Sequence, residues 1–160
     1  MSKKCLMRHC QMFFNKKIQK TDDVVIVKER FRYKTREYGE TVENIVFDII
    51  SIEHNHKAGY CDLRLGMNPD LEILGQVGYH IEERYRGHHY AYRACVLLFQ
   101  IPKELGMEEL LITCNPDNIP SRKTLEALNG KLEKIVDVPK DNICYQNGDR
   151  QKCIFTYHLS

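Results

Sequence analysis

The stretch GYHIEERYRGHHYA, residues 78–91, joins a segment with strand periodicity to a segment with helical periodicity. In its first part, large apolar residues alternate with Gly78 and His80, as they do on a strand with two different faces. After it, apolar residues recur at 91, 94, 95, 98, 99 and 101, the spacing of one helix face. We therefore predict a strand over 71–81 and a helix over 87–105.

The start of this predicted helix has the features of an anion site. The first N–H groups of a helix have no partner within it, and the helix dipole adds partial positive charge, so a phosphate is stabilised there. Gly87 allows close approach of the backbone, and Ala91 is small. Arg86, His88 and His89 add donors. Helix capping alone would explain the same residues, and the sequence contains neither a Rossmann glycine triplet nor a Gly-Lys-Ser/Thr phosphate loop.

The rest of the chain is predicted to supply strands and one more helix. Alternating or β-branched runs predict strands over 24–32, 44–53, 58–65, 109–114, 131–138 and 152–159. Asn118 is a good N-cap for a second helix, which Asn129-Gly130 ends. The polar segments 33–42 and 139–148 are predicted loops.

This order of elements predicts an α+β (mixed α/β) fold in a single domain over residues 1–160. A strand–helix–strand unit implies a parallel pair, while the first strands form hairpins, so the sheet should be mixed, with a helix on at least one face. No repeat or linker divides the chain, and 160 residues suffice for one sizeable core. Residues 1–20 are expected to form a loose or helical extension.

The composition argues against several partners. A formal charge of +2 is too small to suggest a nucleic-acid partner, and no apolar run approaches the roughly 20 residues that span a membrane. The seven cysteines include no CxxC pair, which favours reduced thiols in the cytoplasm. Cys5, His9 and Cys10 lack a second ligand pair, so no metal site is expected.

Two ordered motifs resemble those of the GNAT superfamily of acyl-CoA N-acyltransferases. Residues 86–91, RGHHYA, are similar to the family's acetyl-CoA signature Q/R-x-x-G-x-G/A, which lies between its fourth strand and a long helix. The segment NPDNIPSRKTLEALNG, residues 115–130, resembles its N-x-x-S motif and following helix. The similarity is firm over about 75–133, and the wider run looks like the branch of ribosomal-protein acetyltransferases. Two motifs at compatible spacing are more specific than either alone.

The resemblance implies a fold and a coenzyme site. It implies a mixed, mostly antiparallel sheet of about six or seven strands, splayed at its centre, with helices on its faces. Acetyl-CoA would lie in the splay, as a co-substrate and without a metal. The residues that would bind it are Ile81, Glu83, Arg86, Gly87, His88, His89, Tyr90, Ala91, Asn118, Ser121 and Arg122.

Two positions depart from the family pattern. His89 stands where the signature usually has Gly, and its side chain could crowd the phosphate or donate to it. Leu125 stands where many members carry a Tyr that protonates the departing thiolate. The acid role would then be vacant or filled from elsewhere.

The transfer itself requires further residues beside the coenzyme site. Direct attack by an amine needs a base, an oxyanion donor, expected near Ile81, and an acid. The catalytic candidates are Glu72, His80, Cys114 and Tyr145, with Glu53 and His54 as further possible bases. Each has a structural alternative, such as a solvated strand carboxylate or a buried packing thiol.

The sequence therefore supports an N-acetyltransferase that moves an acetyl group from acetyl-CoA to a primary amine of a small molecule or protein. The alternative is a non-catalytic acyl-CoA-binding or regulatory domain on the same fold. A structural or nucleic-acid-binding domain is a third reading, against which the near-neutral charge argues. We expect a cytoplasmic protein that binds neither nucleic acid nor membrane, with a homodimer as one option.

Overall fold

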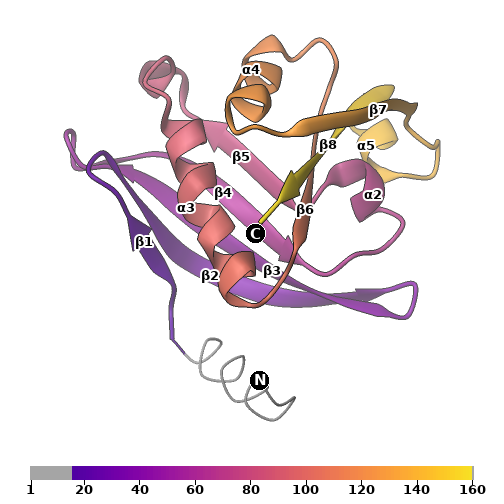
Figure 1. Ribbon diagram of the computed structural model, residues 1–160, viewed down its shortest axis with the longest axis horizontal. Helices are drawn as coiled ribbons and strands as arrows, with labels where there is room; N and C mark the ends of the chain where they lie inside the picture. Colours follow the sequence, from indigo (N-terminus) through magenta and orange to yellow (C-terminus); the bar gives the residue numbers. More distant parts are fainter. Residues whose placement is uncertain (1–15, 160) are drawn as a thin grey trace.

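Two antiparallel sheets that meet and then separate form the frame of the molecule (Figure 1). The computed structural model describes residues 16–159. The first sheet has the order β1 (Gln19–Thr21), β2 (Val25–Glu37), β3 (Glu40–Ser51), β4 (His56–Leu65) and β5 (Val77–Ile81). The second has the order β6 (Glu109–Cys114), β8 (Gln151–His158) and β7 (Lys131–Asp137). The helices are α2 (Leu71–Leu74), the 3₁₀ turn η1 (Glu83–Tyr85), α3 (Tyr90–Glu104), α4 (Ile119–Ala127) and α5 (Ile143–Gln146). The predicted α+β class is confirmed.

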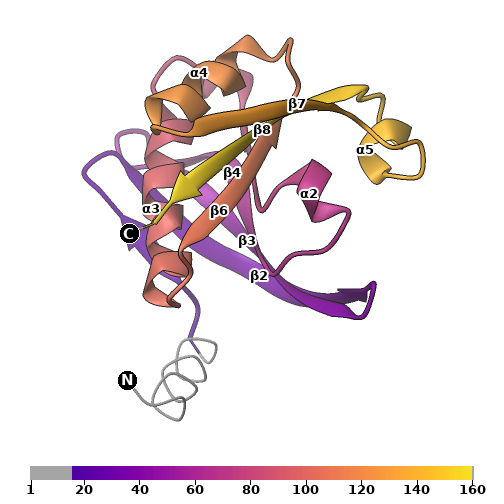
Figure 2. The same ribbon diagram turned by 45° about the vertical axis from the view of Figure 1, so that its right-hand side comes forward.

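The helix α3 lies along one face of the first sheet and supplies the centre of the core (Figure 2). Its residues Ala94, Leu98 and Ile101 are fully buried and belong to one apolar cluster with Phe47 and Leu63 of the sheet. Burying each large apolar side chain stabilises the fold by roughly 1.5–3 kcal/mol. The helix and the first sheet are therefore one rigid support for the residues at their ends.

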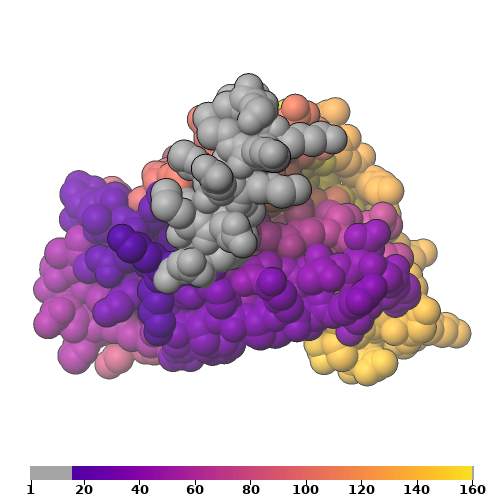
Figure 3. Space-filling view, turned by 90° about the horizontal axis from the view of Figure 1, so that it is seen from below, coloured from indigo at the N-terminus to yellow at the C-terminus, as the bar shows by residue number. Residues whose placement is uncertain are grey.

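The strands β2 and β3 are longer than predicted, and the prediction of a loop over 33–42 is wrong. The two strands continue to a two-residue turn at Tyr38 and Gly39, whose φ angles are 54° and 77°. Two positive φ angles match the twist of a tight hairpin. Most residues of this end meet solvent, so polar residues occupy both faces and the alternation that would signal a strand is lost. Figure 3 shows β2 and β3, indigo to purple, along the lower side of the molecule.

The segment 71–76 was expected to be strand but forms the short helix α2. The side-chain oxygen of Asn68 accepts a hydrogen bond from the N–H of Leu71 at 2.9 Å, which starts a helical turn. Gly75 ends it with a φ of 82°. Local side-chain capping therefore overrides the apolar alternation, and β5 begins only at Val77.

The two sheets meet beside Gln76. Its N–H donates to the carbonyl of Leu111 at 2.7 Å, and its side-chain oxygen accepts from the N–H of Leu111 at 2.9 Å. Every ladder among residues 16–159 is antiparallel, so the predicted parallel pair does not form a ladder. Beyond Gln76, β5 and β6 belong to different sheets, which is the central splay that the family resemblance implies.

The predicted loop 139–148 contains the short helix α5. The side-chain oxygen of Asn142 accepts from the N–H of Cys144 at 2.9 Å and begins this helix. Residues 1–15, with Cys5, His9, Cys10 and most of the predicted extension, lie outside the described residues. Within 16–159, the helices are too short or too polar to cross a membrane.

Candidate coenzyme and acceptor site

A cavity of about 1090 Å³ occupies the opening between β5 and β6. Its walls come from residues 77–81 of β5, the start of α3 with the turn before it, the end of β6 at 113–115, and one face of α4. Arg64 of β4 and Lys152 of β8 also line it. The cavity is thus built at the place where the two sheets separate, between rigid elements.

The turn before α3 exposes backbone to this cavity. The helix begins at Tyr90 rather than at the predicted Gly87, because Gly87 and His89 have φ angles of 83° and 60°, which no helical residue adopts. A Cβ on Gly87 would meet no atom within 4 Å, so this residue borders open space. The side chain of Arg86 turns back, with Nε donating to the carbonyl of Ile81 at 3.1 Å.

The left-handed backbone of His89 explains one departure from the family pattern. Glycine adopts this conformation without cost, which is a physical reason for Gly at this place in the signature. Histidine, like Asn and Asp, is found there more often than other side chains are. His89 is therefore accommodated by the turn, and it lines the cavity.

The start of α4 faces the same cavity. The side-chain oxygen of Asn118 accepts from the N–H of Ser121 at 3.2 Å, so Asn118 is an N-cap of this helix. Ser121 in turn shares a hydrogen bond of 2.8 Å with the hydroxyl of Tyr79 on β5. The hydrogen bond between Tyr79 and Ser121 thus links β5 to α4 at the wall of the cavity.

The structure brings together eight of the eleven residues that the resemblance assigns to coenzyme binding. Those that line the cavity are Ile81, Arg86, Gly87, His89, Tyr90, Ala91, Asn118 and Ser121. The hydroxyl of Tyr90 points into the core, where it lies 3.0 Å from Oγ of Ser51. Its place on the cavity wall therefore does not depend on that hydroxyl.

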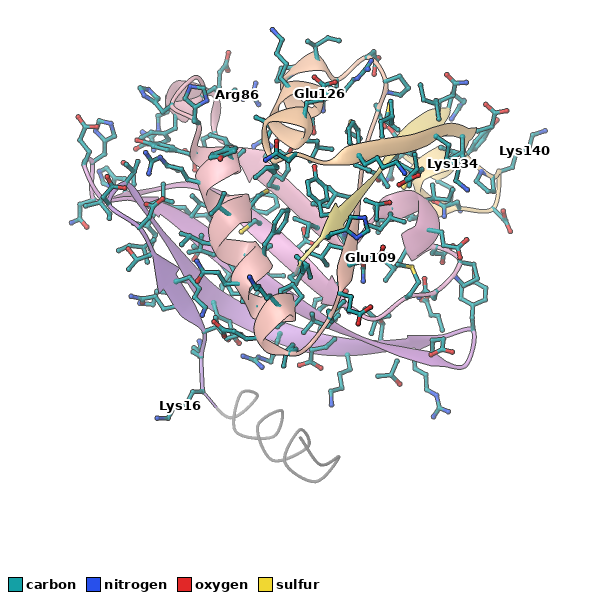
Figure 4. All side chains as sticks on the ribbon, viewed as in Figure 1. Lys16, Arg86, Glu109, Glu126, Lys134 and Lys140 are labelled. Atoms are coloured by element: carbon teal, nitrogen blue, oxygen red, sulfur yellow. The ribbon has the colours of Figure 1, made fainter. Side chains whose placement is uncertain are left out.

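The other three, Glu83, His88 and Arg122, are not among the lining residues. The guanidinium of Arg122 lies 4.0 Å from the carboxylate of Glu126, on the same helix. Figure 4 shows Glu126 and Arg86 at the same end of the molecule, where α3 begins. His88 stacks on Tyr90 with 5.5 Å between ring centroids.

Of the four catalytic candidates, two line the cavity and two do not. His80 and Cys114 line the cavity, whereas Glu72 and Tyr145 do not. Glu72 is exposed on α2, not on a strand, because the capped turn replaces the predicted strand start. The ring of Tyr145 lies on α5, under the guanidinium of Arg150, 3.9 Å away.

The further candidates Glu53 and His54 lie in the turn between β3 and β4, and neither lines the cavity. The ring of His54 packs against Tyr85, with 5.6 Å between centroids. The turn carries both residues past the end of β4, the strand that pairs with β5.

The thiol of Cys114 is ill suited to nucleophilic attack. It is buried, and burial raises its pKa to about 11. It faces Cys153 directly across the β6–β8 ladder. Since the thiolate is the reactive form, very little of it exists near neutral pH.

The Tyr position of the family is occupied by core packing in this chain. Leu125 is fully buried, and its carbonyl accepts a hydrogen bond from the hydroxyl of Tyr157 at 2.8 Å. Tyr79 on β5 is one of the tyrosines that line the cavity, and the sequence analysis did not name it as a catalytic candidate. Burial raises the pKa of Tyr79, and its hydrogen bond with Ser121 only partly opposes this, so the hydroxyl stays protonated. The alternation of Val77, Tyr79 and Ile81 was the available signal.

The cavity also reaches the face of the sheets that lies away from α3. Lys152 lines it there, and its Nζ lies 2.8 Å from the carboxylate of Asp149. Burial would raise the pKa of Asp149, but hydrogen bonds from Lys152 and Asn115 hold it below its usual value. Arg64, Leu74 and Thr113 line the same end. One end is therefore rich in backbone N–H groups and hydroxyls, and the other in charged side chains.

Comparisons with known proteins agree with this architecture. A family model described as acetyltransferase (GNAT) domain matches residues 3–131. None of the curated proteins matches the chain.

Solved structures share the fold. They include an acetyltransferase of the GNAT family from Bacillus anthracis, at 20% identity and a TM-score of 0.57, covering 71% of this chain and 66% of that one. A ribosomal-protein-S5-alanine acetyltransferase from Vibrio fischeri matches at 20% identity and 0.58, covering 73% and 62%. The microcin C7 self-immunity acetyltransferase MccE, solved with acetyl-CoA and AMP, matches at 18% and 0.56, covering 72% and 61%.

At these identities the likeness concerns the fold alone, and the chain spans 61% to 66% of the length of these three proteins. The family model, in contrast, covers well over half of the 160 residues. This protein belongs to the acetyltransferase (GNAT) domain family.

Proposed function

We propose that this protein is an N-acetyltransferase that transfers the acetyl group of acetyl-CoA to a primary amine. The observation that carries the proposal is the cavity between β5 and β6, which joins an exposed helix start to a charged face across the sheets. Membership of the acetyltransferase domain family supports it. So does the shared fold with a protein solved in complex with acetyl-CoA.

The coenzyme end suits a pyrophosphate. Unpaired N–H groups at the start of α3 would donate to it, and Gly87 leaves open space beside them. Asn118 and Ser121 would contact the coenzyme from α4, in addition to their capping bond. Arg86, Ile81 and His89 complete this wall.

The transfer itself would be direct attack of a neutral amine on the thioester. Backbone N–H near Ile81 would stabilise the oxyanion, since β5 has no ladder partner on the side of the opening. The linked hydroxyls of Tyr79 and Ser121 would deliver a proton to the departing thiolate, in place of the Tyr that Leu125 replaces.

A non-catalytic acyl-CoA-binding domain is the alternative, and one observation favours it. Leu125 is fully buried, so this position offers no acid to the thiolate. Both proteins would bind acetyl-CoA, but only an enzyme would release free thiol with an amine.

We infer a cytoplasmic setting, because five described cysteines are free and buried, as expected of reduced thiols. The acceptor would be a small amine or a protein amino group. Four of the solved structures on this fold are named as acetyltransferases of ribosomal proteins, which makes peptide N-termini one class to include. A homodimer is one assembly to test by light scattering.

A thiol-release screen tests the proposal and finds the acceptor class together. Acetyl-CoA would be incubated with spermidine, L-lysine, kanamycin and a serine-alanine-alanine tripeptide amide, and free thiol measured against a no-amine control. We expect at least one amine to accelerate release and to appear acetylated by mass spectrometry. Acetyl-CoA binding without release for a wider panel of the same classes would favour the non-catalytic alternative.

A further inference from the structure

The strand β4 carries charged residues on the face that points away from the core. Tyr60, Asp62 and Arg64 alternate with Cys61 and Leu63, which are fully buried. An alternating charged face on a strand of an antiparallel sheet would ordinarily be a solvated surface. On β4 it is not, because the side chains of Asp62 and Arg64 are only 19% and 16% exposed.

Asp62 lies between residues that line the cavity. The ladder between β4 and β5 places Asp62 opposite Gly78 and Tyr60 opposite His80. Gly78, His80 and Arg64 are all lining residues. Asp62 is not itself a lining residue, but it lies directly beside lining residues on the face away from α3, where an acceptor would meet the acetyl group brought in from the α3 and α4 side.

One carboxylate oxygen of Asp62 pairs with Arg64, and the other lies beside Gly78 of β5. Oδ2 of Asp62 lies 2.6 Å from Nη2 of Arg64, whose Nη1 donates to the carbonyl of Gly75 at 3.0 Å. A Cβ on Gly78 would lie only 2.5 Å from Oδ1 of Asp62. The carboxylate thus covers the space that a side chain at 78 would fill. For Oδ1, no hydrogen-bond donor is found in the part of the chain that is described.

Burial also prepares this carboxylate to exchange a proton. It raises the pKa of Asp62 above the ordinary value, and the charge of Arg64 only partly opposes the shift. Near Asp62 on this face lie Tyr60 on the same strand, His80 on β5 and Asp48 on β3. Asp48 is paired with Lys57 at 2.8 Å and also with Arg30, so it adds little charge here.

We propose that Asp62 is the general base of the transfer, oriented by Arg64 and given its space by Gly78. This assignment rests on the proposed acetyltransferase function. Oδ1 takes one proton from the acceptor ammonium, which leaves a neutral amine. The amine nitrogen forms a bond to the thioester carbon, and the carbon–sulfur bond breaks with its electron pair on sulfur. The thiolate takes its proton from the linked hydroxyls of Tyr79 and Ser121, the second proton lost by nitrogen replaces it on them, and the proton on Asp62 returns to solvent.

The test is Asp62→Asn, which keeps the size of the side chain and removes the base. We expect kcat/KM for the amine that reacts fastest in the screen above to fall about 100-fold or more. Acetyl-CoA affinity by calorimetry should change less than about threefold, because the coenzyme end is untouched. The rate that remains should lose the rise with pH that reports the deprotonation of Asp62.

Asp23→Asn is the matched control. Asp23 also pairs with an arginine, Arg93, at 2.9 Å, but it is exposed, and its partner does not line the cavity as Arg64 does. This variant should keep wild-type kinetics. If Asp62→Asn binds acetyl-CoA poorly or melts early, Asp62→Glu decides instead. If the longer carboxylate of Asp62→Glu restores the pH profile, this supports the assignment of residue 62 as the base.

Wild-type kcat/KM and an unchanged pH profile in Asp62→Asn would overturn the assignment of Asp62 alone. Wild-type protein that binds acetyl-CoA but acetylates no amine of the panel would contradict the proposed enzyme, and the assignment with it. The two failures are therefore distinct.

Discussion

The two ends of the cavity are built in different ways. The coenzyme end consists of the backbone around Gly87 and the first turn of α4, all within about two short segments of chain. The acceptor end consists of side chains from β4, β5, β6 and β8, which are far apart in sequence. A diphosphate is recognised by backbone N–H groups that any sequence offers in the right conformation, whereas proton transfer needs particular side chains. In the proposed function, coenzyme binding therefore depends on two local segments, and catalysis on side chains brought together from several strands.

The largest expected effect breaks the coenzyme end. Gly87→Glu puts a side chain and a negative charge where the pyrophosphate would lie, at a φ of 83° that disfavours any side chain. We expect acetyl-CoA affinity to fall by more than about 100-fold, which is about 2.8 kcal/mol. Calorimetry measures this, with circular dichroism to show that the variant is folded. A folded variant with wild-type affinity would refute the location of the coenzyme.

Tyr79→Phe separates binding from transfer. It removes the hydroxyl that bonds to Ser121 while keeping the ring in the core. We expect kcat to fall about 100-fold and the affinity for acetyl-CoA to stay within a factor of about three. Steady-state kinetics with the best amine provides the measurement. A wild-type kcat would show that the thiolate obtains its proton elsewhere.

Gly78→Ala tests the acceptor end from the other side. The new methyl would lie 2.5 Å from Oδ1 of Asp62, so that carboxylate must move. A displacement of this size in a catalytic group is expected to lower kcat/KM about tenfold, with little change in coenzyme affinity. Loss of acetyl-CoA binding together with activity would show that the two ends are not independent.

The smallest effect belongs to His89→Gly at the coenzyme end. Relief of the left-handed strain, roughly 1 kcal/mol, is partly offset by the greater entropy of Gly in the unfolded chain. We expect the free energy of unfolding in urea to rise by no more than about 1 kcal/mol. A clear loss of stability would mean that the imidazole makes a contact that outweighs the strain.

The comparison also explains what the sequence could predict. The strand and helix that flank residues 78–91 were predictable, because their periodicity is set by one buried face each. So was the gathering of eight proposed coenzyme residues around one cavity, because these residues are contiguous in two motifs. The strands at 33–42 could not be predicted, because a β-ribbon exposed on both faces loses the alternation of apolar and polar residues. The helix α2 could not be predicted either, because capping by the Asn68 side chain forms a helical turn where a strand was expected to begin.

The sequence did not predict the residues of the acceptor end, for a different reason. Asp62 and Arg64 have the pattern of a solvated strand face, and only the cavity beside Gly78 makes them an interior pair. Glu72 was one of several candidate bases because of its place along the chain, but a helical turn carries it to the surface. Tyr79 followed the apolar pattern of the core, and its hydroxyl partner Ser121 comes from a helix forty-two residues later.

The central claim is that the opening between β5 and β6 is an acetyl-CoA site. Titration of the wild-type protein with acetyl-CoA in a calorimeter tests it most directly, alongside the melting temperature with and without coenzyme. The expected result is saturable binding with one site per chain, a higher melting temperature, and loss of both in Gly87→Glu. Absence of heat and of any melting shift at millimolar acetyl-CoA would contradict it.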